Sequence, residues 1–265
     1  MAAMLTRDQI TKAAKDLTEA RLAVGQIDSL GDNAPNDPAS AHMIATSHAE
    51  MLGWEPIGWK VGCTSARAMQ ILNSPESFPG RVFKDTVYGP EPLPYDAIHN
   101  PMIESEFAFV LGKNLPPRDS QYSVEEVKEA TLAVVPSFEI ATSRFTDWGA
   151  VSYLSLIADS GQNGGVVFGD PVETEHCPSL AGITVTLTID GEEVSAGNGS
   201  DILGDPWRSL EWLVNHLSAR QIELKANEFV LSGTCTGAIL LPGGSTATAS
   251  FTGFGEVSIT RTAQG

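Results

Sequence analysis

From about residue 75 to its end, the chain consists mainly of short apolar segments separated by turn residues. Segments rich in Val, Ile, Phe and Thr, bounded by Gly, Pro, Asn or Asp, are typical of β-strands. The pair Asp190-Gly191 predicts a tight hairpin turn at the end of one such segment. This pattern predicts a β-rich core with strands at 104–112, 132–140, 164–168, 183–190, 228–233 and 250–261.

The first 52 residues have a helical pattern instead. Residues 5–24 are amphipathic, and Thr6 with Gln9 forms the sequence signature of a capping box at the helix start. A second helix is expected from Pro38, which suits a first helical position, to about residue 51. Further helices are predicted inside the β-rich part, at 65–73, 123–133 and 206–217.

Together these patterns predict an α+β protein that folds as one domain overall. We expect a helical N-terminal region over 1–56, followed by a β-rich catalytic core over 57–265. A chain of 265 residues can bury a sizeable core, and its hydrophobic fraction of 42% is ordinary for a globular protein.

Charge and cysteine content exclude several classes of function. A formal net charge of −17 argues against a nucleic-acid partner, because phosphate binding needs clustered Lys and Arg. The cysteines at 63, 177 and 235 lie far apart, so neither a disulfide framework nor a zinc knuckle is indicated. No segment approaches the ~18 apolar residues of a membrane span. We therefore expect a cytoplasmic protein without a membrane partner.

The sharpest chemical signal is the segment 103–111, IESEFAFVL. Residues two apart in a strand project to the same face, so Glu104 and Glu106 point the same way while Phe107 and Phe109 occupy the other face. Two adjacent carboxylates on an apolar strand repel each other unless protons or a cation lie between them. A hard cation such as Mg²⁺ or Mn²⁺ prefers such oxygen ligands. The spacing of Glu104 and Glu106 alone also fits two glutamates that are simply exposed to water.

Other residues carry weaker signals. Glu139 ends a second apolar segment, and Lys60 lies between Trp59 and Val61 in a β-type segment. A partly buried lysine can have a lowered pKa and act as an acid or a base, although on sequence alone a lysine extending from an edge strand is the more common case. The segment 233–237 (GTCTG), which contains Thr234, can bring backbone N–H groups near an anion or form a simple tight turn.

The order of several segments is more specific than any of them alone. The chain resembles the fumarylacetoacetate hydrolase superfamily, and in particular its branch of 2-keto-4-pentenoate hydratases and 4-oxalocrotonate decarboxylases. The resemblance extends from about residue 40 to 261. The segments that carry it include 57–65 (IGWKVGCTS), 80–83 (GRVF), the strand 104–111, 136–140 (PSFEI), 157–160 (IADS), 231–234 (LSGT) and 253–257 (GFGEV).

The resemblance implies a mixed β-sheet roll around one Mg²⁺ or Mn²⁺. It places the metal ligands at Glu104, Glu106 and Glu139 and the active-site lysine at Lys60. The metal would chelate the carboxylate and 2-oxo oxygens of a small 2-oxo acid and stabilise its enolate. Lys60 would then move the proton. A homo-oligomer is also implied by the resemblance alone.

One segment departs from the family pattern. Members of this branch carry an acid before an FG-type segment, but here Phe78 stands at that position in Ser77-Phe78-Pro79-Gly80-Arg81. We expect Arg81 and Thr234 to bind substrate, because a guanidinium beside Gly80 is suited to a second carboxylate. Pairing of Arg81 with a surface acid is the alternative.

These observations favour a metal-dependent lyase in aromatic catabolism, a hydratase of a 2-hydroxy-2,4-dienoate or 2-oxo-4-enoate acid. The same site would also suit a 2-oxo acid decarboxylase, or a hydrolase that cleaves the C–C bond of an acylpyruvate. A hydrolase needs a base to activate water, for which His99 is the candidate in sequence. A non-catalytic member that only binds a metabolite is the third possibility.

Overall fold

The structure is a computed structural model that describes residues 4–265, so residues 1–3 of the expected N-terminal region lie outside it. Its two long N-terminal helices begin where the sequence predicts. The Thr6 hydroxyl accepts the Gln9 N–H at 3.3 Å at the start of α1 (Arg7–Leu22), and the Gln9 side chain accepts the Thr6 N–H at 3.0 Å. Pro38 opens α2 (Pro38–Leu52) after Asp37, whose side chain accepts the Ser40 N–H.

The remaining α-helices and strands place short helices between groups of strands. In chain order they are β1 (Pro56–Gly62), α3 (Ala66–Ile71), β2 (Phe78–Phe83), β3 (Val87–Tyr88), β4 (Met102–Leu111), α4 (Val124–Ala130), β5 (Thr131–Ala141), α5 (Tyr153–Ala158), β6 (Asn163–Phe168), β7 (Val172–Glu173), β8 (Thr184–Ile189), β9 (Glu192–Asn198), α6 (Pro206–Ser218), β10 (Phe229–Thr234), β11 (Ile239–Leu240), β12 (Thr246–Phe251) and β13 (Gly255–Thr260).

Two sheets form the core. The large sheet has nine strands with the main order β2-β1-β10-β4-β5-β6-β3, and it is mixed because β1 and β10 pair in parallel while β4 and β5 pair antiparallel. The small sheet has the order β13-β12-β8-β9. The Phe107 ring on β4 makes edge contacts with the rings of Phe251 and Phe254, at 5.2 and 5.5 Å between centroids. Apolar burial between the sheets therefore holds them together.

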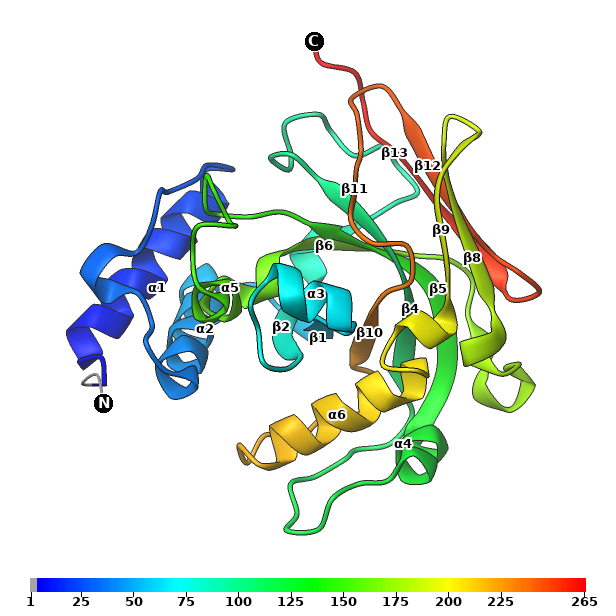
Figure 1. Cartoon of the computed structure of the whole chain (residues 1–265), viewed down its shortest axis with the longest axis horizontal. Helices are drawn as coiled ribbons and strands as arrows, with labels where there is room; N and C mark the ends of the chain where they lie inside the picture. The colour runs from blue at the N-terminus through cyan, green and yellow to red at the C-terminus, as the bar shows by residue number, and fades with distance from the viewer. Residues whose placement is uncertain (1–3) are drawn as a thin grey trace.

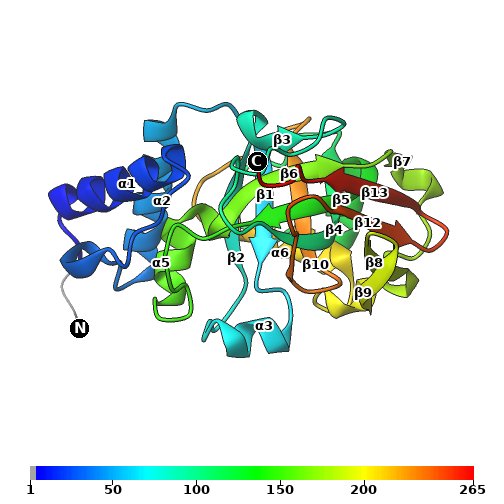
Figure 2. The same cartoon turned by 90° about the horizontal axis from the view of Figure 1, so that it is seen from above.

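The helices cover the sheets at separate places (Figure 1). α1, α2 and α5 gather at one end of the molecule and share a hydrophobic cluster with Phe78 of β2. α6 packs against β10 and β1 of the large sheet and against α4. Figure 2 shows the same separation from above, with the small sheet at the opposite end from α1 and α2. This arrangement is the mixed β-sheet roll with an N-terminal helical region that we expected.

Two expectations about strands were wrong. Residues 250–261 are not one strand but parts of β12 and β13, which pair as a hairpin, and Gly253 lies between them with a φ of +69°. β2 was missed because Pro79 and Gly80 interrupt its apolar pattern. The hairpin turn at Asp190-Gly191 is confirmed, since it joins β8 to β9 with positive φ at both residues. The division of the chain at residue 57 stays a prediction.

Within residues 4–265, none of the helices combines the length and apolar character needed to cross a bilayer.

Candidate metal centre

β4 places two carboxylates on one face of the large sheet. Glu104 and Glu106 share a face with Ala108, whereas Phe107 and Phe109 belong to the main hydrophobic core on the other face. Glu139 on β5 pairs in register with Glu104, so its side chain lies on the same face. Carboxylate oxygens of the three glutamates all lie within 4.8 Å of one another. The spacing on one strand and the register between two strands thus produce a three-carboxylate cluster.

Lys60 reaches this cluster from β1, which is separated from β4 by β10. Its Nζ lies 3.2 Å from Glu139 Oε2, and the residue is only 4% exposed. A Cβ added at Gly80 would lie 2.1 Å from the Ser160 carbonyl oxygen and 3.0 Å from Lys60 Cγ. Gly80 is therefore needed for close packing of backbone and lysine stem, not for contact with a ligand.

The electrostatics of the cluster follow from burial of like charges. Burial, followed by repulsion from Glu139, raises the pKa of Glu104 to about 7. The same causes, with repulsion from Glu104 added, raise the pKa of Glu106 well above its usual value. For Lys60, burial acts to lower the pKa, but attraction by Glu139, Glu104 and Glu106 outweighs it and the pKa is raised. The three glutamates therefore oppose the lowered lysine pKa that the sequence suggested.

Hydrogen bonds hold two of the carboxylates while leaving one oxygen of each unsatisfied. The Gly233 N–H donates to Glu106 Oε2 at 2.8 Å, and Asn163 Nδ2 donates to Glu139 Oε1 at 3.1 Å. Glu106 Oε1 is buried without a hydrogen-bond partner, and Glu139 Oε2 is contacted by the Lys60 ammonium alone. Unsatisfied buried carboxylate oxygens are costly. A divalent cation with oxygen ligands fits these positions.

A second set of residues supports Glu139 and was not predicted from sequence. Arg144 donates from Nη1 to the Asn163 carbonyl oxygen at 3.2 Å, and it forms a buried ion pair with Asp159. Asn163 in turn donates to Glu139. Asp159 lies in the 157–160 segment that carries the family resemblance, and Arg144 follows the Glu139 strand by a few residues. Isolated charged residues of this kind carry no periodic signal, so only the resemblance could have drawn attention to them.

Thr234 lies at the edge of the cluster. It pairs in register with Glu106, and its hydroxyl accepts the Thr236 N–H at 3.2 Å and contacts the Gly237 carbonyl oxygen at 3.3 Å. The preceding residue makes the closer contact, since Gly233 donates to Glu106. Gly233 has a φ of +96°, and a Cβ there would lie 2.1 Å from Thr64 Oγ1. The turn therefore acts on the cluster through the Gly233 N–H.

The structure does not bring Arg81 to the glutamates, which differs from the expectation. Arg81 pairs in register with Trp59 and Lys60 pairs with Gly80, so Arg81 and Lys60 project to opposite faces of the sheet. The Arg81 guanidinium lies 3.5 Å from the centroid of the Trp59 ring and 3.4 Å from Glu228 Oε1. Because side chains alternate between the two faces along a strand, Arg81 points away from the cluster. It pairs with Glu228 instead, and pairing with an acid was the alternative stated for Arg81.

Phe78 stands on the glutamate side of β2 and is buried. It pairs with Gly62, and a Cβ at Gly62 would lie 2.9 Å from the Phe78 ring and 3.1 Å from Lys60 Nζ. An apolar ring therefore stands close to the amino group of Lys60, where the family pattern has an acid. Glu76, the nearest acid in sequence, is exposed.

A second cluster of residues among 4–265 also brings metal-ligating atoms together. Glu173, Glu175 and His176 also bring ligand atoms within 4.8 Å of one another, but all three are exposed. Exposed carboxylates are solvated by water and need no cation. The buried cluster, with its unsatisfied oxygens, is the better candidate.

A mixed β roll that buries three glutamate carboxylates beside a lysine is the kind of site that a metal-dependent enzyme needs. The family described as fumarylacetoacetate hydrolase C-terminal matches residues 64–260. The chain is 31% identical to the 2-keto-4-pentenoate hydratase of Paraburkholderia xenovorans (strain LB400) over 258 residues, which cover 96% of this chain and 95% of the relative. The chain therefore belongs to the fumarylacetoacetate hydrolase family.

Two further similarities concern decarboxylases of the same family. A 4-oxalocrotonate decarboxylase from a Pseudomonas species is 28% identical over 264 residues, which cover 97% of this chain and 99% of the relative. The structure of 4-oxalocrotonate decarboxylase from Pseudomonas putida G7, complexed with magnesium and adipate, superposes with a TM-score of 0.87. It is 25% identical, and the match covers 98% of this chain and 100% of that chain. Divalent metals are thus used in this family.

Proposed function

We propose that this protein is a metal-dependent hydratase of a small 2-hydroxy-2,4-dienoate or 2-oxo-4-enoate acid. The observation that carries the proposal is the buried cluster in which three carboxylates converge, two of them with unsatisfied oxygens, beside Lys60. The likeness to a 2-keto-4-pentenoate hydratase over nearly the full length of both chains supports this reaction.

In this proposal Glu104, Glu106 and Glu139 hold one Mg²⁺ or Mn²⁺. When bound, the cation supplies the positive charge that stabilises an enolate oxygen of a 2-oxo acid. Gly233 and Asn163 each hold one oxygen of Glu106 and Glu139, so that Glu106 Oε1 and the Lys60-facing Glu139 Oε2 remain as ligands for the cation. Glu104 is less buried than Glu106 and Glu139, so a small molecule approaches the cluster from the side of Glu104.

Lys60 is the proposed proton carrier. Its ammonium is buried, and it contacts Glu139, so it can hold a proton beside bound substrate without exchange into bulk water. Ketonisation of a 2-hydroxy-2,4-dienoate removes the hydroxyl proton and places one on the terminal carbon, which yields an enone. Water then adds to C4 while C3 gains a proton. Lys60 would donate the carbon-bound proton in the first step.

Two observations favour a substrate with a single carboxylate. The Arg81 guanidinium, the residue expected to bind a second carboxylate, lies on the opposite face of the sheet from Lys60. Close to Lys60 Nζ stands Phe78, whose ring cannot bind an anion. An apolar or neutral chain end suits these surroundings better than a dicarboxylate does.

The alternative is a decarboxylase that uses the same cluster, because loss of CO₂ from a 2-oxo acid produces the same type of enolate. The structural similarity to 4-oxalocrotonate decarboxylase supports this alternative. A C–C hydrolase has less support, since His99 is exposed and its ring contacts Asn100 at 3.0 Å.

An assay of the purified protein with Mg²⁺ distinguishes these reactions. We expect loss of the diene absorbance of 2-hydroxypenta-2,4-dienoate, with a product whose mass is increased by one water. EDTA should abolish the reaction and added Mg²⁺ or Mn²⁺ should restore it. Release of CO₂ from 4-oxalocrotonate, without hydration of the dienoate, would contradict the hydratase and establish the decarboxylase.

Arg81→Ala tests the substrate class. Because Arg81 contacts Trp59 and Glu228 rather than the cluster, we expect KM for mono- and dicarboxylic 2-oxo substrates to change less than about two-fold. The variant should lose a little thermal stability instead, since the contact with Trp59 is partly buried. A selective rise in KM for dicarboxylates would show that Arg81 does bind substrate.

We further propose that the protein acts in the cytoplasm as a homo-oligomer, without a nucleic-acid or membrane partner. The acidic surface, with a net charge of −17, supports the absence of nucleic acid. Analytical ultracentrifugation of the purified protein would measure the oligomeric state.

A further inference from the structure

A second charged group lies away from the glutamates, at the end of α1. Arg21 is 8% exposed, and neither of its Nη atoms has a hydrogen-bond partner. Its guanidinium lies 5.1 Å from the centroid of the Trp54 ring and 5.4 Å from that of Phe83. The cation therefore lies over two aromatic rings, which supply no acceptor for its N–H groups.

The charges around Arg21 do not balance. Arg144 is the other buried cation near Arg21. Its guanidinium N–H groups donate to Asp159 and to the Asn163 carbonyl oxygen. His48 adds no charge, because burial and the two arginines lower its pKa to about 2. Two buried guanidinium groups therefore share one carboxylate, and the unsatisfied one is Arg21. An uncompensated buried charge is strongly unfavourable.

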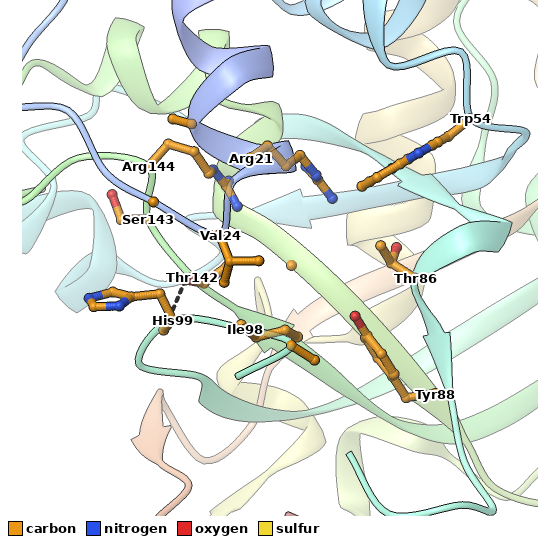
Figure 3. A pocket seen from close by; sticks show the side chains of 14 residues that line it. Arg21, Val24, Trp54, Thr86, Tyr88, Ile98, His99, Thr142, Ser143 and Arg144 are labelled. Atoms are coloured by element: carbon orange, nitrogen blue, oxygen red, sulfur yellow. Dashed lines mark hydrogen bonds between the residues drawn. The ribbon is translucent and has the colours of Figure 1, made fainter. Parts of the chain in front are cut away.

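Arg21 borders a cavity of about 60 Å³ that none of the three glutamates or Lys60 lines. Figure 3 shows the guanidinium of Arg21 and the hydroxyl of Tyr88 both directed into this space. Val24, Ala97 and Ile98 contribute apolar surface to the same wall. One water needs at least about 10–15 Å³ of such space, so the cavity has room for a group of several heavy atoms.

We propose that this cavity is a binding site for a small monocarboxylate, with Arg21 as its anchor. A planar carboxylate accepts two parallel hydrogen bonds from a guanidinium edge, which would satisfy both unpaired Nη atoms. The Tyr88 hydroxyl can donate a third. Val24 and Ile98 then face the short apolar part of the ligand. Burial and repulsion by Arg144 lower the pKa of Arg21 to about 9, so Arg21 is still charged at neutral pH.

The site is separate from the proposed metal cluster, because their lining residues do not overlap. Gly164 on the cavity wall directly follows Asn163, which donates to Glu139. Failure of one proposal therefore leaves the other standing, because the two sites share no charged residue.

Thermal unfolding of the EDTA-treated protein with increasing acetate tests this site, because acetate then has no metal ion to bind in the glutamate cluster. Ionic strength is held constant with a bulky sulfonate, which acetate replaces stepwise. Acetate several-fold above its dissociation constant should raise Tm by about 2–4 °C for wild type. Arg21→Met should show no such rise, and in acetate-free buffer its Tm should equal or exceed that of wild type. Arg7→Met, an exposed position on the same helix, is the matched control and should respond like wild type.

A milder variant and a crystal structure complete the test. Tyr88→Phe keeps the ring and should weaken acetate binding about five-fold, as expected for one lost hydrogen bond. A crystal grown in acetate should show the anion between Arg21 and Tyr88. An equal acetate response in wild type and Arg21→Met would overturn the proposal. So would a cavity filled by water alone or by an acidic side chain of a second copy of the chain.

Discussion

Glu106→Gln should abolish the stabilisation of the protein by Mg²⁺ and reduce turnover by at least about 100-fold. Gln keeps an oxygen that can accept the Gly233 N–H but removes the charge that a divalent cation requires. Without Mg²⁺, the variant should be at least as stable as wild type, because one of three mutually repelling buried carboxylates is gone. Thermal unfolding with and without Mg²⁺ measures both effects.

Glu173→Gln is the matched control for this prediction. Glu173 belongs to the exposed group with Glu175 and His176, which has a similar spacing of ligand atoms. We expect this variant to keep the Mg²⁺ response and the turnover of wild type. If the Mg²⁺ response survives in Glu106→Gln and disappears in Glu173→Gln, the metal is bound at the surface and the proposed centre is wrong.

Lys60→Met should lower kcat by about 10²–10⁴-fold, the usual contribution of a general acid or base. Its affinity for Mg²⁺ should be unchanged or higher, because the Lys60 ammonium lies 3.2 Å from Glu139 and competes with a cation for that oxygen. Met fills the space between Gly80 and Gly161 that the lysine stem occupies. Steady-state kinetics and Mg²⁺ titration of the variant separate the two effects.

Lys84→Met serves as the control for loss of a lysine, since Lys84 forms an exposed ion pair with Glu55. This variant should retain wild-type kcat and Mg²⁺ affinity. A Lys60→Met variant with near wild-type kcat would mean that Lys60 only balances the charge of the glutamates. The proton carrier would then have to be another group.

The sequence by itself determined most of the local structure. Features that depend only on neighbours in the chain all appear in the structure. They are the helix starts at Thr6 and Pro38, the hairpin at Asp190-Gly191 and the amphipathic pattern of α6. The shared face of Glu104 and Glu106 also follows from one strand alone. Family resemblance, not spacing, brought Glu139 and Lys60 into the same prediction.

Only the tertiary structure decided how distant segments meet. The register of β5 on β4 sets Glu139 opposite Glu104, and the register of β2 on β1 turns Arg81 away from Lys60. A one-residue change of register moves a side chain to the other face of a sheet, and no local pattern encodes that register. The unpaired Arg21 likewise became visible only when α1 packed beside Trp54, because an unsatisfied charge is a property of its surroundings.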